Sequence, residues 1–308
     1  MLVRREVILA KIESVYNTDP SPVAGTDAIL VENPAWSHEA ANLIERNGVK
    51  ATIGKTKSIY GSTLKTITFD VELKGSGSEG VAPEIGPLLR ACGMDETIVA
   101  STSVTYAPVS TGFESITLYY YSDGTRHIIT GARGNVSFTM EAGQAAKASF
   151  TFTGHDGGFS DASMVSPAYD TTVPVPLINI GFTVGGYSAS LQSLTFDMGN
   201  TVAFPPDMSA ADGFGEIIIN ARDVNGSFNP EQVLVATNDY IGDWKAGSNL
   251  ALATGVIGGT AGNRFAISMP AVTYRDIAPG DREGLRTMEI GFGAGESSGD
   301  DEVSIAFT

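Results

Sequence analysis

A period-two alternation of apolar and polar residues limits this chain to a narrow range of folds. In Thr66–Leu73 (TITFDVEL), Ile, Phe, Val and Leu alternate with Thr, Asp and Glu. This spacing places the apolar side chains on one face of a strand and the polar ones on the other, which is typical of a half-buried strand. Similar segments recur along the chain, at Glu6–Ser14, Ala28–Glu32, Ser115–Tyr121, Arg126–Gly131, Val136–Met140, Ala148–Thr153, Leu177–Val184, Ser190–Phe196, Glu216–Ala221, Leu250–Val256, Arg264–Met269, Arg286–Phe292 and Glu302–Phe307.

Turn signals separate these segments, and helical signals are few. Asp123-Gly124 lies between two apolar segments, which is a strong hairpin signal. Pro83–Cys92 places Ile, two Leu and Cys on one helical face, so a short helix is expected there. Asn229 followed by Pro230 has the residues of a second helix start. Many strands and two short helices indicate β-sandwich or β-barrel domains.

The length of 308 residues favours two domains, and the two halves resemble diverged copies. We expect an N-terminal arm or strand over 1–34, a first domain over 35–156, a linker over 157–176 and a second domain over 177–308. Each half shows a strand, a Pro-Glu pair with a short helix, a Gly-x-Arg hairpin, a turn glycine and an aromatic closing strand. The paired features are Pro83-Glu84 and Pro230-Glu231, Gly124–Arg126 and Gly262–Arg264, Gly143 and Gly280, and Phe152 and Phe292. This shared order predicts an internal duplication.

Charge and cysteine content exclude several classes of protein. The formal net charge is −16, whereas a protein that grips nucleic acid normally shows a basic face. This acidity serves either solubility or a functional acidic surface. Cys92 is the single cysteine, so neither an intramolecular disulfide nor a cysteine-based zinc site is expected, and its place on the apolar helical face indicates a core residue. The charged N-terminus is unlike a signal peptide, and the uncharged segments Thr171–Phe196 and Ala246–Asn263 are too polar for a membrane helix.

No motif in the sequence carries a convincing chemistry. Gly75–Gly80 spells GxGxxG, but prolines follow it and no βαβ pattern surrounds it, so a strand-to-helix loop is favoured over a dinucleotide site. Asp223–Glu231 has alternating oxygen-bearing residues like a calcium loop, but its glycine and final acidic residue are misplaced, and bound calcium is left open. The spacing of His38, His127 and His155 does not favour zinc. We therefore expect no catalytic, cofactor-binding or metal-binding residues, and no enzyme activity.

Three segments carry a resemblance to a known family. They are 10–34 (AKIESVYNTDPSPVAGTDAILVENP), 69–93 (FDVELKGSGSEGVAPEIGPLLRACG) and 119–154 (YYYSDGTRHIITGARGNVSFTMEAGQAAKASFTFTG). These segments resemble the tail tube, or major tail, proteins of long-tailed, non-contractile bacteriophages, including the Mu-like transposable group. The resemblance covers the first half well and the second half through the internal duplication.

The resemblance implies a structural virion protein with tandem β-sandwich or barrel domains, each with one short helix. Six such domains form a ring, so a duplicated subunit would supply a ring as a homotrimer. Rings stack into a tail tube, assembled in the host bacterial cytoplasm, through which DNA passes without specific binding. The implied partners are further copies of the chain, the tape measure protein inside the channel, and the tail terminator and distal tail proteins. A tube protein of a contractile tail or secretion-type injection machine, or a non-tube β-sandwich virion or adhesion module, remains an alternative.

Two groups of residues are expected to serve assembly. Asp70 and Glu72 lie on the polar face of their strand, so they are candidates for an acidic channel lining that would repel DNA; exposure to outer solvent is the competing interpretation. The N-terminal strand is a candidate for pairing with a neighbouring subunit, because exposed strand edges associate in this way. Its candidate residues are Val7, Ile8, Leu9 and Ile12.

Overall fold

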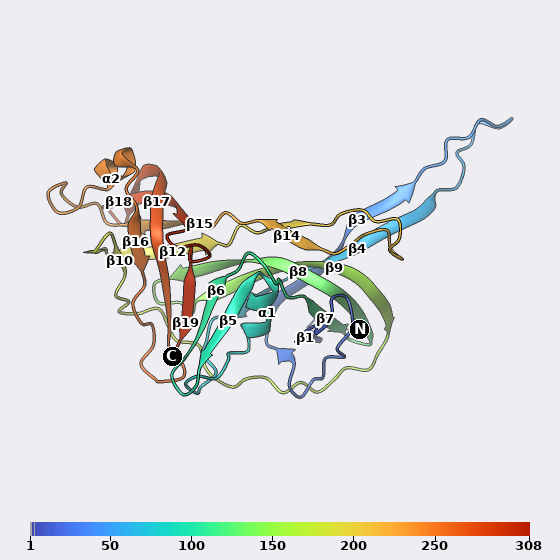
Figure 1. Ribbon diagram of the computed structural model, residues 1–308, viewed down its shortest axis with the longest axis horizontal. Helices are drawn as coiled ribbons and strands as arrows, with labels where there is room; N and C mark the ends of the chain where they lie inside the picture. The colour runs from blue at the N-terminus through green and yellow to red at the C-terminus, as the bar shows by residue number, and fades with distance from the viewer. Residues whose placement is uncertain (1, 3) are drawn as a thin grey trace.

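The computed structural model describes residue 2 and residues 4–308; Met1 and Val3, which belong to the expected N-terminal arm, lie outside the described residues. The fold is mainly β, as predicted (Figure 1). The elements of the first half are β1 (Glu6–Ile12), β2 (Ala28–Ile29), β3 (Glu32–Ile44), β4 (Ile59–Glu72), α1 (Gly86–Ala91), β5 (Met94–Val99), β6 (Ser103–Pro108), β7 (Ile116–Ser122), β8 (Thr125–Glu141) and β9 (Lys147–Asp161). Those of the second half are β10 (Thr183–Val184), β11 (Tyr187–Ser188), β12 (Leu191–Asp197), β13 (Thr201–Ala203), β14 (Ile218–Ala221), β15 (Asn225–Pro230), α2 (Tyr240–Ala246), β16 (Leu250–Ala253), β17 (Phe265–Arg282), β18 (Leu285–Gly295) and β19 (Ser304–Phe307).

The two halves pair their strands in the same order. In the first half, the antiparallel order is β2-β1-β7-β8-β9-β4-β3. In the second half, it is β11-β10-β16-β17-β18-β15-β12, and each strand occupies the place of its counterpart. We call these two sets the first repeat and the second repeat. Both short helices follow the equivalent strand, β4 or β15, along the chain, and this agreement supports the internal duplication.

The two repeats join through one strand pair into a continuous sheet. The end of β8, at residues 137–141, pairs with β12 at residues 193–197. Because β8 also pairs with β9, and β12 with β15, eight strands follow one another in the order β3-β4-β9-β8-β12-β15-β18-β17. We call this arrangement the continuous sheet. A second connection lies at β19, which belongs to neither set and pairs on one side with β17 of the second repeat and on the other with β6.

The core lies on one face of the continuous sheet, as the alternating pattern predicted. Phe69 of β4 pairs with Phe150 of β9, and their rings are 5.8 Å apart. Phe152 of β9 and Phe292 of β18 hold equivalent places, as the sequence predicted, and both are fully buried. Cross-strand aromatic pairs of this kind and the burial of their apolar area stabilise both repeats.

Each repeat sends out one long hairpin, and the two hairpins lie very differently. The first arm (residues 38–62) is the outer part of β3 and β4, and the second arm (residues 198–222) contains β13 and β14. In Figure 1 the β3–β4 hairpin projects away from the rest of the molecule, whereas β14 lies over β8 and β9. Although the arms follow equivalent strands, the fold of the monomer supports just one of them.

Three predictions about local structure need correction. No helix starts at Asn229, which lies in β15. Its side-chain oxygen accepts from the backbone N–H groups of Gln192 and Ser193, where the pairing of β12 with β15 shifts register, and not from the first turn of a helix. The helix begins at Tyr240, with Asp239 as N-cap. Gly280 is not a turn residue, because β17 continues to the turn at residues 283–284, and β9 extends to residue 161, into the expected linker. The Pro83–Cys92 helix and the Asp123-Gly124 hairpin are confirmed as α1 and the β7–β8 turn.

Candidate functional site

The face of the continuous sheet opposite the core is polar. Hydroxyl, amide and carboxylate groups bond across neighbouring strands: Thr66 to Thr153 at 3.0 Å, Ser149 to Asp70 at 2.6 Å, Asn135 to Asp197 at 2.6 Å and Thr195 to Ser227 at 3.0 Å. The face is hollowed where β8, β12, β15, β17 and β18 meet. These polar side chains therefore satisfy part of their hydrogen-bonding capacity within the face itself.

Acidic residues dominate the charged groups of this face. Asp70 and Glu72 are on it, as their alternation with buried Phe69 and Val71 predicted. Other carboxylates there belong to Glu141, Asp197, Asp276 and Glu289. Lys147 and Arg275 are basic, but Lys147 forms an ion pair with Glu32 at 2.5 Å and Arg275 with Asp223 at 2.5 Å. The hydrogen bonds from Arg275 lower the pKa of Asp223, so the partner stays ionised. The face is therefore acidic on balance.

The continuous sheet ends at two edges that no strand of the described residues covers. One is β3, which pairs with β4 on its other side. The second is the part of β17 beyond residue 276. There β18 pairs with one side of β17, and the other side is open because β16 pairs with β17 only as far as Val272. Unpaired N–H and C=O groups along such edges are templates for pairing with another chain.

The predicted inter-subunit strand lies inside the first repeat. β1 pairs with β7 along its whole length and with β2 at Ile8 and Leu9. Val7 and Leu9 pack in a small apolar cluster with Tyr119 and Tyr121, and Ile8 is in the main core with Ile12 against it. These four residues thus stabilise their own subunit, and their contact with a neighbour stays a prediction.

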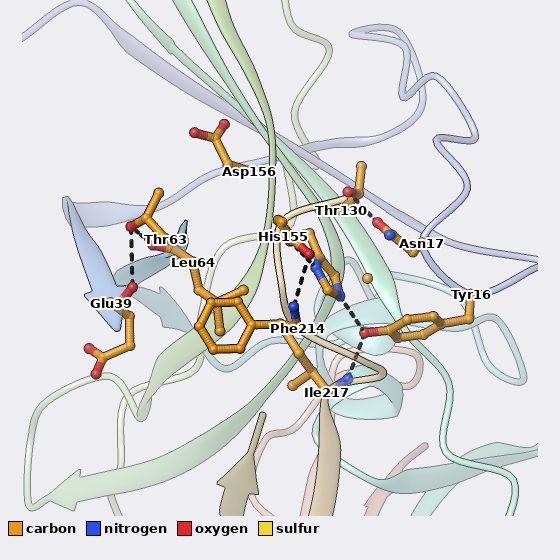
Figure 2. Close-up of polar contacts among 12 residues, drawn as sticks. Tyr16, Asn17, Glu39, Thr63, Leu64, Thr130, His155, Asp156, Phe214 and Ile217 are labelled. Atoms are coloured by element: carbon orange, nitrogen blue, oxygen red, sulfur yellow. Dashed lines mark hydrogen bonds and ion pairs between the residues drawn. The ribbon is translucent and has the colours of Figure 1, made fainter. Parts of the chain in front are cut away.

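A buried polar cluster holds the second arm against the first repeat (Figure 2). The Tyr16 hydroxyl accepts from the Ile217 N–H at 2.6 Å, and its oxygen lies 2.9 Å from His155 Nε2. His155 Nδ1 lies 2.5 Å from the Asp212 carboxylate. When the Tyr16 hydroxyl donates to Nε2 of a neutral imidazole, the imidazole proton is on Nδ1, and this N–H donates to Asp212. Burial raises the pKa of Tyr16 to about 12, so its hydroxyl keeps the proton that this arrangement needs.

Arg133 is the second point that fixes this arm. Its side chain, on β8, is almost fully buried and donates to the backbone carbonyls of Phe113, Glu114 and Ile217. It also forms an ion pair with Glu216 of the arm at 2.8 Å. A guanidinium presents several donors in a rigid fork, which explains how one residue joins an arm and a loop of the first repeat.

The sequence did not reveal this cluster, because its members are far apart in the chain. Tyr16 and His155 are 139 positions apart, and His155 and Asp212 are 57 apart. In the sequence, His155 stands out only as a histidine whose spacing does not favour zinc, and no motif distinguishes Arg133. Contacts between residues this far apart follow no fixed spacing in the chain, so a single sequence gives no signal for them.

Other motifs have structural places. The glycine-rich loop at 75–80 packs on the connection before β17, where the Gly77 N–H donates to the Gly262 carbonyl at 3.0 Å. Cys92 is fully buried, and burial raises its pKa. Across residue 2 and residues 4–308, no cluster of three or more His, Cys, Asp or Glu side chains suits a metal ion. Within the same residues, no helix is long and apolar enough to cross a membrane.

The polar sheet face, the open sheet edges and the packed second arm belong to a mainly β protein whose described residues contain no cluster suited to a metal ion. A family model described as phage tail tube protein matches residues 4–308. The chain therefore belongs to the phage tail tube protein family, and it is a structural component of a virion tail. No curated protein matches the chain by sequence.

Proposed function

We propose that three copies of this chain close into a ring, and that stacked rings form the tail tube through which the phage genome is delivered. The observation that carries the proposal is the junction between the repeats. There, the end of β8 pairs with β12, and the equivalent edges at the two ends of the continuous sheet, on β17 and β3, are open. The same pairing between copies would extend the sheet from one chain to the next.

The equivalence of the repeats gives the register of this pairing. Residues 278–282 of β17 correspond to 137–141 of β8, and residues 33–37 of β3 correspond to 193–197 of β12. Trp36 of one copy would then lie opposite Pro279 of the next, as Phe196 lies opposite Phe138 within the chain. Pro34 and Pro279 lack an N–H, which limits non-specific association of these edges before assembly.

Such a contact is compatible with a closed assembly. An interface between two different surfaces of a subunit is heterologous, and it closes into a ring when the rotation is right. Two repeats per chain supply six repeats from three chains. Three sheets of eight strands would exceed the 16–18 strands that leave a water-filled channel in porins. A wide channel is thus compatible with the number of strands.

The polar face would line this channel. Asp70 and Glu72 would then meet the tape measure protein during assembly and DNA during ejection. DNA carries one charge per about 1.7 Å, so a basic lining would retain it, and like-charge repulsion would keep it moving. Following the resemblance of the first half, we assign the chain to long, non-contractile tails of the Mu-like transposable group. Assembly would take place in the host cytoplasm, with terminator and distal tail proteins at the tube ends.

Electron microscopy of the assembled protein tests the ring. We expect rings or tubes with three chains per ring and with 278–282 of one copy paired to 33–37 of the next. Six chains per ring, or β3 and β17 left unpaired in the ring, would contradict the proposal.

A DNA-retention assay tests the channel face separately. Tubes with Asp70→Lys and Glu72→Lys should retain double-stranded DNA at low salt, because two carboxylates per chain become cations on the lining. The matched control carries Asp95→Lys and Asp161→Lys, which reverse two exposed charges, one on β5 outside the continuous sheet and one at the last residue of β9. Equal retention by both variants would show that Asp70 and Glu72 do not line the channel.

A further inference from the structure

The first arm is a two-stranded ribbon without a core of its own. None of the residues 38–62, all of which the structure describes, is buried. Ile44 is 47% exposed and Tyr60 is 64% exposed, and Leu43, Val49, Ile53 and Ile59 are exposed too. An isolated two-stranded hairpin is at best marginally stable in water. Apolar side chains over such a ribbon therefore indicate a surface that is covered in the assembled protein.

The charge of the first arm is opposite to that of the molecule. Its outer end carries Arg46, Lys50, Lys55 and Lys57, whereas the whole chain has a net charge of −16. Glu45 is the acidic residue among them, and it lies 3.4 Å from Lys55. A basic, partly apolar segment on an acidic protein is complementary to the surface of another copy.

The second arm shows where an arm of this fold lies. Trp36 pairs with Ile67, which pairs with Phe152 on its other side, and Phe196 pairs with Gly226, which pairs with Phe292. Trp36 and Phe196 therefore occupy equivalent positions. The chain from Trp36 to its partner Ile67 and the chain from Phe196 to its partner Gly226 are almost equally long, so the two arms have nearly the same length. Counted along the chain from Trp36 and Phe196, Thr52 corresponds to Asp212, which contacts His155 in the neighbouring repeat.

The corresponding place for the first arm is on a second repeat. Counted from Phe152 and Phe292, Gly295 of β18 corresponds to His155 of β9. Gly295 opens an acidic loop, which we call the 296–302 loop, with carboxylates at Glu296, Asp300, Asp301 and Glu302. Within the loop's own repeat, Arg222 pairs with both Asp300 and Glu302, so one cation faces two carboxylates there.

We propose that the first arm lies across the second repeat of the next copy in the same ring, with its basic end against the 296–302 loop of that copy. The counting places Lys50 and Thr52 close to Gly295 and Glu296. The second repeat of the same chain cannot receive the arm, because the first arm and the second repeat lie on opposite sides of the first repeat (Figure 1). This inference rests on the proposed ring, and it names the partner of its arm.

Cysteine cross-linking tests the contact, because the native Cys92 is fully buried. The test variant carries Lys50→Cys and Glu296→Cys, and assembled protein is treated with a short bis-maleimide and analysed under denaturing conditions. We expect covalent dimers and trimers with no larger species, because each arm reaches one neighbour and three such contacts close the ring. The controls are each single variant and Lys50→Cys with Val173→Cys, which places the second cysteine on an exposed residue of the connection between the repeats.

The outcomes separate this inference from the proposed ring. An unlimited ladder of multimers would show that the arm contacts a different ring, and monomers alone in tubes of normal appearance would show that it does not reach the loop. Either result overturns the arm contact while the ring stands. Absence of rings and tubes for unmodified protein under the microscope would instead overturn the ring.

A charge exchange gives a second measurement. Lys50→Glu with Lys55→Glu should reduce the assembled fraction in sedimentation at least several-fold at low salt, because it opposes like charges across the contact. Adding Glu296→Lys should restore part of the loss. Equal assembly of all three proteins would contradict the contact.

Discussion

The two arms of this protein have equivalent origins and nearly equal lengths, yet one is packed and the other projects into solvent. Ile217 of the second arm is 0% exposed and Ile219 is 7% exposed, whereas Ile44 and Tyr60 of the first arm are largely exposed. The second arm also has Asp212 and Glu216, which meet His155 and Arg133 of the first repeat. Topology therefore provides the arm, and the side chains on the neighbouring repeat decide whether the monomer can hold it.

Replacement of Arg133 should have the largest effect on the second arm and make it more like the first. Arg133→Met removes the donors to three backbone carbonyls, of which that of Ile217 is in a buried site and those of Phe113 and Glu114 are in partly buried ones. We expect the free energy of unfolding to fall by about 3–5 kcal/mol, mostly from these unpaired groups and less from the half-exposed Glu216. Urea denaturation of unassembled protein measures the loss, and limited proteolysis should show faster cleavage within 204–217.

Arg46→Met on the first arm is the matched control. Arg46 is exposed, so its replacement should change the free energy of unfolding by no more than about 0.5 kcal/mol. If both variants lost stability equally, the assignment of Arg133 as the residue that holds the second arm would be wrong.

Truncation of one isoleucine on each arm should give a smaller contrast. Ile217→Ala removes a fully buried side chain, so the expected cost is about 2–4 kcal/mol. Ile53→Ala affects a fully exposed residue at the outer end of the first arm, and the expected cost in unassembled protein is below about 0.5 kcal/mol. In assembled protein, the same Ile53→Ala change should lower the thermal transition. An unchanged transition would indicate that the first arm stays uncovered.

The base of the first arm should respond to pH. His127 of β8 lies between Trp36 of β3, with ring centroids 4.2 Å apart, and Phe159 of β9, at 4.4 Å. Burial, and then the nearby Lys65 cation, lowers the pKa of His127 to about 4 from its ordinary 6.5. Between these values the unfolded chain binds more protons than the folded one. The stabilising contribution is therefore complete above about pH 6.5 and is lost as the pH falls toward 4.

The variant His127→Phe keeps a ring in this place and removes the titration. We expect wild-type protein to lose about 1–3 kcal/mol more than the variant between pH 7 and pH 4.5, measured by urea denaturation at each pH. Parallel pH profiles for the two proteins would show that His127 does not titrate in this way.

Residue patterns alone predicted most of the β structure, because alternation is a local property of the chain. The face of β4 that holds Phe69 and the opposite face that holds Asp70 follow directly from the period of two. The helix at Asn229 was predicted wrongly for the same reason. Its side chain has the chemistry of a cap, but neighbouring strands claim its hydrogen bonds, and local sequence does not describe those neighbours.

The sequence by itself determined the mainly β fold class, the acidic character and the hairpin at Asp123-Gly124, since composition and local residue patterns are enough to specify them. Tertiary structure alone decided that β8 and β12 join the repeats into one sheet, and that Tyr16, His155 and Asp212 meet. Strand pairing and side-chain clusters bring together residues that are far apart in the sequence, and packing across the whole molecule selects which of them touch. Whether each arm is packed or exposed is also decided by tertiary structure, because equivalent hairpins pack differently against different neighbours.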